Sequence, residues 1–163
     1  MATVVGPDGF ATRYEYDPTG RIHTIVEPGD RTWRVGYDDW PDGSQTVTTT
    51  APDGSSTAAL IASSGREIVR WVYDANGSAL EQTTSAYEFD RLTESTVTRG
   101  RSKQVTSTRH DLVGRVVGVE TTLDGATTRS DSYTYQDGRL VAASNTTESA
   151  EYGYDAAGSR VRR

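Results

Sequence analysis

The sequence predicts an all-β fold of consecutive antiparallel β-hairpin repeats that form a curved or spiralling sheet. A signal of the form aromatic-x-aromatic-Asp-x-x-Gly recurs along the chain at roughly 20-residue spacing, which is typical of a repeat architecture. The polar residues are rich in Thr, which favours strands. Short strand-like runs are separated throughout by turns that contain Gly, Pro or Asp.

The recurring signal is clearest at residues 14–21, and it has a direct structural interpretation. In a type I turn, Asp17 at the first position accepts backbone hydrogen bonds, and Gly20 at the fourth adopts positive φ. The arginine after the glycine is expected to reach the aspartate or to stack on a ring. Further copies, complete or degraded, span residues 71–77, 87–90, 108–115, 133–139 and 152–158, and residues 37–38 form a degenerate one.

The two aromatic residues of each copy are expected to point to opposite faces of the sheet, and stacked copies are expected to form an aromatic ladder. This interpretation assigns structural roles to the turn residues and needs no ligand. The residues assigned to the repeat turn are Tyr14, Tyr16, Asp17, Gly20, Arg21, Trp71, Tyr73, Asp74, Gly77, Asp111, Gly114, Tyr133, Tyr135, Gly138, Tyr152, Tyr154, Asp155 and Gly158.

Strand–turn–strand patterns follow one another along the chain. The segment 57–64 is the best helical candidate, but it is too short to be a stable helix. We therefore expect a single hairpin array over residues 1–163, with 1–9 and 160–163 as frayed ends. The expected strands cover residues 21–26, 31–37, 45–50, 67–73, 78–84, 92–99, 103–110, 115–123, 127–135, 139–146 and 150–154, with a return strand from Ser55 and a stub at 159–162.

Composition and charge exclude several classes of function. The net charge is −6, which argues against nucleic acid as a partner, because phosphate binding needs a basic surface. The absence of cysteine excludes disulfides, thiolate metal sites and a cysteine nucleophile. No run of 18 apolar residues is present, so we expect no membrane-spanning helix. Hydrophobic residues make up only 34% of the chain, which predicts a thin sheet with one apolar face.

Few residues are candidates for chemistry. His110 takes the place of the second aromatic in its copy, and His23 is interpreted as a packing or surface residue. An acidic cluster at residues 38–42 lacks the spacing of a calcium loop. We therefore predict no catalytic residues, no metal site, no cofactor and no enzymatic activity. Trp33 and Trp40 are the candidates for binding a ligand, because exposed aromatic rings can bind sugars.

Residues 14–22 resemble the signature of the YD repeats, also called RHS repeats, at every defined position. Residues 71–80 and 152–161 are similar to the same signature with small departures, and the resemblance extends over residues 6–160. Proteins of this family include bacterial polymorphic toxins, insecticidal toxin complexes and the teneurins. The resemblance implies a segment of a large shell of spiralling β-hairpins.

The function implied by the resemblance is that of a structural segment of an exported shell, which encloses or presents a toxin or adhesion domain without catalysis. The partners would be neighbouring repeats or domains of a larger polypeptide, secreted by a bacterium or held at its surface. The chain has too few repeats to close a shell and lacks the family's self-cleaving segment and a toxin domain, so we expect a fragment. The alternative is a free-standing module that binds a carbohydrate or a cell-surface protein.

Overall fold

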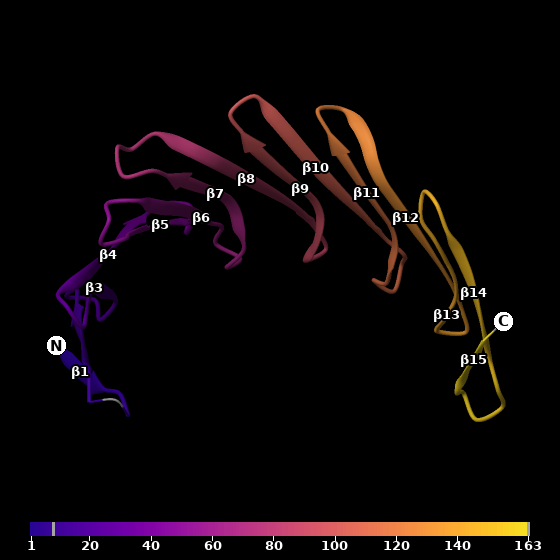
Figure 1. Ribbon diagram of the computed structural model, residues 1–163, viewed down its shortest axis with the longest axis horizontal. Coiled ribbons are helices and arrows are strands. Elements are labelled where there is room, and N and C mark those ends of the chain that lie inside the picture. Colours follow the sequence, from indigo (N-terminus) through magenta and orange to yellow (C-terminus); the bar gives the residue numbers. More distant parts are fainter. Residues whose placement is uncertain (8, 163) are drawn as a thin grey trace. The chain divides into compact units, whose positions relative to one another are not determined.

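The structure is a computed structural model that describes residues 1–7 and 9–162. Residues 8 and 163, which belong to the predicted frayed ends, lie outside the described residues. The chain divides into two compact units, Met1–Thr84 and Ser85–Arg163. Every regular element of the described residues is a β-strand, and each strand pairs antiparallel with its sequence neighbours (Figure 1). The predicted all-β fold of consecutive hairpins is confirmed.

The first unit contains seven strands and most of an eighth, and its pairings are antiparallel from β1 to β8. The segment 57–64 falls in strand β6 and the turn after it, so this segment is not helical. The strands are β1 (Ala2–Val5), β2 (Ala11–Tyr16), β3 (Ile22–Glu27), β4 (Arg31–Asp39), β5 (Gln45–Thr50), β6 (Ser56–Ile61), β7 (Glu67–Tyr73) and β8 (Ala79–Glu88), the last of which continues into the second unit.

The second unit contains the end of β8 and seven further strands. Strands β9 to β12 are long, and Figure 1 shows β9 beside β10 and β11 beside β12. The strands are β9 (Arg91–Arg99), β10 (Ser102–His110), β11 (Val116–Leu123), β12 (Ala126–Gln136), β13 (Arg139–Ser144), β14 (Ser149–Tyr154) and β15 (Arg160–Arg162).

Two kinds of turn make most of the hairpins. In the longer kind, the N–H of the first residue donates a hydrogen bond to the carbonyl of the residue four positions later. The N–H of the glycine at the fourth position donates to the carbonyl of the first residue. These turns start at Asp17, Trp40, Ala51, Ala62, Asp74, Asp111 and Asp155. In the shorter kind, two residues with positive φ form a type I′ turn, as at Asp124-Gly125 and Asp137-Gly138.

The copies of the repeat signal do not all lie at one edge of a sheet. In an up-and-down meander, successive turns alternate between the two ends of the strands. In the first unit the Asp17 turn joins β2 to β3, whereas the Asp74 turn joins β7 to β8 and therefore lies at the opposite end. A β-carbon built on Gly54 would lie 3.4 Å from Ala75 Cβ, which places the turns at 51–55 and 74–78 side by side. Trp71 and Tyr73 therefore do not continue the ladder of Tyr14 and Tyr16.

The prediction that the two aromatics of a copy face opposite sides of the sheet is wrong. Side chains alternate along a strand, so residues two apart share a face. Tyr152 and Tyr154 in β14 are such a pair, and both line one hollow on that face. Among the described residues no hydrophobic side chain is buried, so these units have no conventional core. Each sheet depends instead on its ladders, its turns and the contacts of half-buried rings.

Candidate functional site

The Asp17 turn shows how the repeat signal works as a local structure. The Asp17 carboxylate accepts hydrogen bonds from the backbone N–H groups of Thr19 and Arg21, both at 2.9 Å. Its other oxygen accepts from Arg21 Nε at 3.0 Å. Gly20 has a φ of +88°, a conformation that glycine adopts without steric cost. One side chain thus satisfies several donors of the turn.

These hydrogen bonds change the acidity of the turn carboxylates. Hydrogen bonds from the Thr19 hydroxyl and the Arg21 N–H hold the pKa of Asp17 far below its ordinary value of 3.8. For Asp111, partial burial opposes the change, but the Arg115 N–H and guanidinium still lower the pKa of the carboxyl group. Asp17 and Asp111 are therefore charged at neutral pH and act as hydrogen-bond acceptors.

The same arrangement recurs at other copies of the signal. Asp74, Asp111 and Asp155 each accept the backbone N–H of the residue four positions later, at 2.8–2.9 Å. Gly77, Gly114 and Gly158 all have positive φ. The copy at residues 133–139 differs, because its Asp137 lies in a two-residue turn and Gly138 provides one of two positive φ angles.

An arginine from one copy of the signal stacks on a tyrosine of the next copy. The guanidinium of Arg21 lies 4.4 Å from the ring centre of Tyr37, that of Arg115 lies 4.6 Å from Tyr135, and that of Arg139 lies 5.2 Å from Tyr154. Arg21 and Arg115 also bind the aspartate of their own turn, at 3.0 and 2.7 Å. We call this arrangement the Arg–Tyr bracket.

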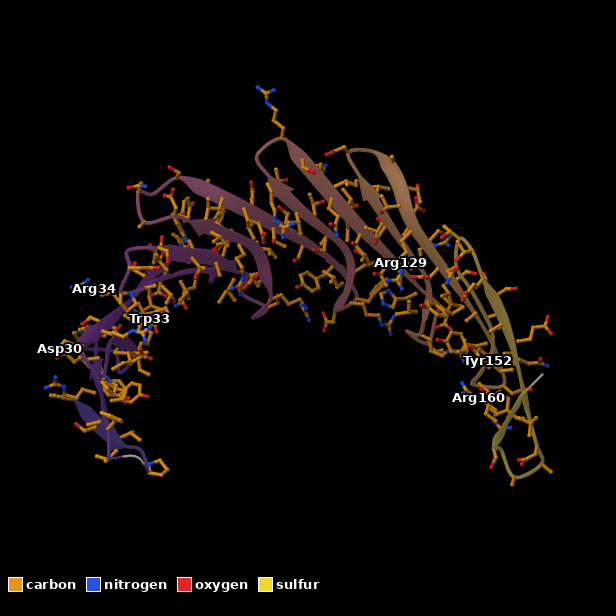
Figure 2. All side chains as sticks on the ribbon, in the orientation of Figure 1. Asp30, Trp33, Arg34, Arg129, Tyr152 and Arg160 are labelled. Atoms are coloured by element: carbon orange, nitrogen blue, oxygen red, sulfur yellow. The ribbon has the colours of Figure 1, made fainter. Side chains whose placement is uncertain are left out.

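A tyrosine hydroxyl completes the bracket in two places. Tyr37 Oη donates to the carbonyl of Ile22 at 3.0 Å, and Tyr154 Oη donates to the carbonyl of Leu140 at 2.8 Å. Each accepting carbonyl belongs to the residue that directly follows the arginine of the bracket. The ring and the hydroxyl of the tyrosine therefore both contact the neighbouring hairpin. A related stack places Arg160 of β15 at 5.1 Å from the Tyr152 ring, and Figure 2 labels both side chains.

Three hollows in the second unit occur between strands or at the ends of their ladders. A hollow of about 430 Å³ lies between β13 and β14, lined by Arg139, Tyr152 and Tyr154. A smaller hollow of about 290 Å³ is lined by Tyr133, Ala143, Ala150 and Tyr152. A third, of about 840 Å³, lies between the ends of β9 and β10 and includes Arg91, Arg109 and His110.

The sequence interpretation missed the most buried charged group. Asp131, in β12, is only 6% exposed. Its Oδ2 accepts from Arg129 Nε at 2.6 Å, and Figure 2 labels this arginine. Both residues line the hollow of about 290 Å³. An Arg-x-Asp pattern in a strand places both side chains on one face, and this was the signal that could have identified the pair.

The two tryptophans proposed for ligand binding have different surroundings. Trp40 is 52% exposed, opens the turn at 40–44, and donates its indole N–H to Thr46 Oγ1 at 3.1 Å. Trp33 lies in β4 opposite Ile25, and its indole nitrogen is buried without a hydrogen-bond partner among the described residues. Only Trp40 therefore offers an exposed ring.

The other polar candidates have structural contacts. Asp39 accepts hydrogen bonds from the Gln45 amide and from the Arg21 guanidinium, the latter at 2.9 Å. The Gln45 hydrogen bond, followed by that of Arg21, lowers the pKa of the Asp39 carboxyl group. Asp42 accepts from the N–H and hydroxyl of Ser44. His23 Nδ1 lies 2.6 Å from Thr24 Oγ1. No part of the described chain forms a helix with the length and apolarity that a bilayer crossing requires.

No family model matches the chain, and no curated protein matches it. Among solved structures, the chain is similar to a protein in the crystal structure of TcdB2-TccC3-TEV, with 14% sequence identity and a TM-score of 0.32. The match covers 98% of this chain and 12% of that one. The chain therefore spans about an eighth of the length of this neighbour.

Proposed function

We propose that this chain is a structural segment of a YD-repeat shell, in which Arg–Tyr brackets hold successive copies of the repeat together. The observation that supports this function is the recurrence of the bracket at Arg21–Tyr37, Arg115–Tyr135 and Arg139–Tyr154. Its residues serve the connection between repeats and do not converge on one centre. A solenoid stabilised by such nearest-neighbour contacts suits a wall or scaffold.

The finer proposal follows from the resemblance of the motif. The wall would belong to a longer exported bacterial polypeptide and would enclose or present a toxin or adhesion domain. The segment itself would carry out no catalysis, and its partners would be the repeats and domains on either side. Edge strands with free backbone groups pair readily with another strand, which is how a neighbouring repeat would continue the sheet.

The mass of the native polypeptide tests this proposal. An antibody against the segment is used on blots of the source cells and their medium. We expect a secreted or surface band many times heavier than the 17.7 kDa of this chain. A native band of that smaller mass would contradict the shell proposal, because so few repeats cannot enclose a domain.

A second candidate function is a binding module for glycans or a cell-surface protein, and the 52% exposure of Trp40 favours it. Ligand that binds the folded state raises the melting temperature. A glycan that raises the melting temperature of the wild type but not of Trp40→Ala would support this function. Equal shifts in both proteins would exclude Trp40 as the site.

A further inference from the structure

The turn that joins β7 to β8 contains an exposed Asn-Gly pair, Asn76-Gly77. The chain has two asparagines, Asn76 and Asn145, and only Asn76 precedes a glycine. The turns that start at Asp17, Asp111 and Asp155 have threonine, valine and alanine at the position before their glycine. The turn at residues 74–78 therefore differs from the other copies of the repeat in its chemistry.

An Asn-Gly pair has a defined reaction with water, called deamidation. The backbone nitrogen of Gly77, after losing its proton, attacks Cγ of Asn76, and the side-chain nitrogen of Asn76 leaves as ammonia. Water then opens the resulting cyclic imide at either carbonyl, which gives aspartate or isoaspartate at position 76. Glycine favours the attack because it has no side chain to hinder its nitrogen. The reaction consumes one water and needs no oxidant or reductant.

The side-chain amide of Asn76 is open to this reaction. It is exposed and makes no hydrogen bond with the described residues. A β-carbon built on Gly77 would meet nothing within 4 Å, so the space around the reacting nitrogen is open. Asn145 differs, because its Oδ1 accepts the backbone N–H groups of Thr147 and Glu148, both at 2.8 Å. The amide of Asn145 is thus held in its turn, whereas that of Asn76 is not.

The backbone of the closed turn restrains the attacking nitrogen. The N–H of Gly77 donates to the carbonyl of Asp74 at 3.0 Å. The N–H groups of Asn76 and Ser78 donate to Asp74 Oδ1 at 2.9 and 2.8 Å. The Gly77 nitrogen must leave its hydrogen bond before it can attack Asn76. The reaction therefore requires a local opening of the turn, and exposed turns open at a low free-energy cost.

The turn at residues 74–78 also lacks the arginine that closes two of its counterparts. The carboxylates of Asp17 and Asp111 are each bound by the arginine that follows the glycine of their turn. Ser78 occupies that position here, and Asp74 makes no ion pair with any described residue. Fewer contacts hold this turn closed, so it should open more often than the turns at Asp17 and Asp111.

We propose that Asn76 is a modification site, at which the folded protein slowly deamidates at a rate set by opening of the turn at residues 74–78. Isoaspartate adds a bond to the backbone, which is incompatible with the hydrogen bond from Gly77 to Asp74. Either product places a second carboxylate two residues from Asp74, with no arginine to bind it. The modification therefore weakens the hairpin of β7 and β8 next to its Tyr73–Ala79 pair. The inference does not depend on the proposed shell function.

Mass spectrometry of the purified full chain, incubated at neutral pH with and without urea, tests the site. We expect Asn76 to lose its amide in both samples, about tenfold more slowly in the folded chain, because the turn must open first. Asn145 should keep its amide over the period in which Asn76 reacts in the folded chain. An intact Asn76 in the folded chain after the unfolded chain has reacted completely would overturn the proposal. Equal rates in the two samples, or equal losses at Asn145, would overturn it as well.

Two variants with opposite effects test control by the turn. Asp74→Ala removes the acceptor of two backbone N–H groups and should speed the reaction of Asn76 about fivefold. Ser78→Arg introduces the arginine found in the turns at Asp17 and Asp111 and should slow the reaction about threefold. Asp111→Ala is the matched control, because it removes the equivalent carboxylate from a turn of the second unit and should leave the rate at Asn76 unchanged. Unchanged rates in both Asp74→Ala and Ser78→Arg would overturn the proposal.

Thermal unfolding of the modified protein tests the consequence. Ion exchange separates the deamidated chain, which carries one more negative charge, from the unmodified chain. The isoaspartate form should melt roughly 2–4 °C lower than the unmodified chain. Asn76→Asp adds the charge without the extra backbone bond, so it should melt between the two. Asn76→Gln, incubated in the same way, should show no change at this turn. An isoaspartate form that melts with the unmodified chain would overturn the proposed weakening of the hairpin.

Discussion

At the residue scale, Asp17 and Gly20 stabilise one turn by different physical means. Asp17 acts in the folded state, where its carboxylate accepts two backbone N–H groups and the Arg21 side chain. Gly20 acts through the backbone, because its φ of +88° is unfavourable for a residue with a side chain. The two contributions can therefore be measured separately, one by changing pH and the other by adding a methyl group.

Gly20→Ala should destabilise the protein by about 1 kcal/mol, whereas Gly36→Ala should be close to neutral. A β-carbon at either glycine meets nothing within 4 Å, so the two sites differ in backbone conformation and not in space. Gly36 lies in strand β4 and is not among the glycines with positive φ. Urea unfolding of both variants measures the difference. Equal losses would show that the turn conformation at Gly20 is not what matters.

Asp17→Asn should lower the free energy of unfolding at neutral pH. Below about pH 4, the free energy of unfolding of this variant should fall less steeply with pH than that of the wild type. The pKa of Asp17 is lowered on folding from 3.8, so its charged form stabilises the fold above about pH 4. This contribution disappears as the pH falls from 3.8 towards the folded pKa. Unfolding free energies from neutral pH to about pH 2 should therefore converge for the two proteins. Parallel pH profiles would contradict this role of the carboxylate.

At the element scale, the Arg–Tyr bracket joins a hairpin to the next one where their backbones are not paired. The β3–β4 ladder ends at the Thr24–Arg34 pair, and Arg21 and Tyr37 meet beyond it. The bracket therefore replaces hydrogen bonds of the ladder with a stacked cation, a tyrosine hydroxyl bond and an ion pair. Strands can diverge at this end without losing contact.

A double-mutant cycle on Arg21 and Tyr37 should reveal a coupling energy of about 0.5–1 kcal/mol. The cycle uses Arg21→Ala and Tyr37→Leu, and it removes the separate contribution of the Arg21 contacts with Asp17 and Asp39. Tyr37→Phe should cost about 1 kcal/mol alone, because it leaves the Ile22 carbonyl without its donor. Additive losses in the cycle would show that the guanidinium and the ring do not interact.

The sequence predicted most of the strands and turns, but it assigned residues 1–9 and 160–163, which contain β1 and β15, to frayed ends. Turn chemistry is local, so Asp17, Pro18 and Gly20 predict their turn without tertiary information. The opposite placement of the Asp17 and Asp74 turns depends on how many strands intervene, which a 20-residue spacing does not determine.

At the scale of the whole molecule, the important property is the large surface that remains exposed. The chain has a solvent-accessible surface of 11,094 Å², and no hydrophobic side chain among the described residues is buried. A compact protein of the same mass would expose roughly 8,000 Å². Stability must therefore come mostly from ladders, turns and half-buried rings, and less from the apolar burial that dominates in globular domains.

Urea unfolding of the isolated chain should show a denaturant slope, the m-value, roughly a fifth smaller than that of a compact protein of the same length. The m-value scales with the surface exposed on unfolding, and this chain has less surface left to expose. Fluorescence of Trp33, Trp40 and Trp71 can follow the transition at several protein concentrations. An m-value as large as that of a compact protein, independent of concentration, would mean that the chain buries more surface in solution than this structure does. An m-value that rises with concentration would instead indicate that copies cover one another's sheets, as neighbouring repeats would in a longer polypeptide.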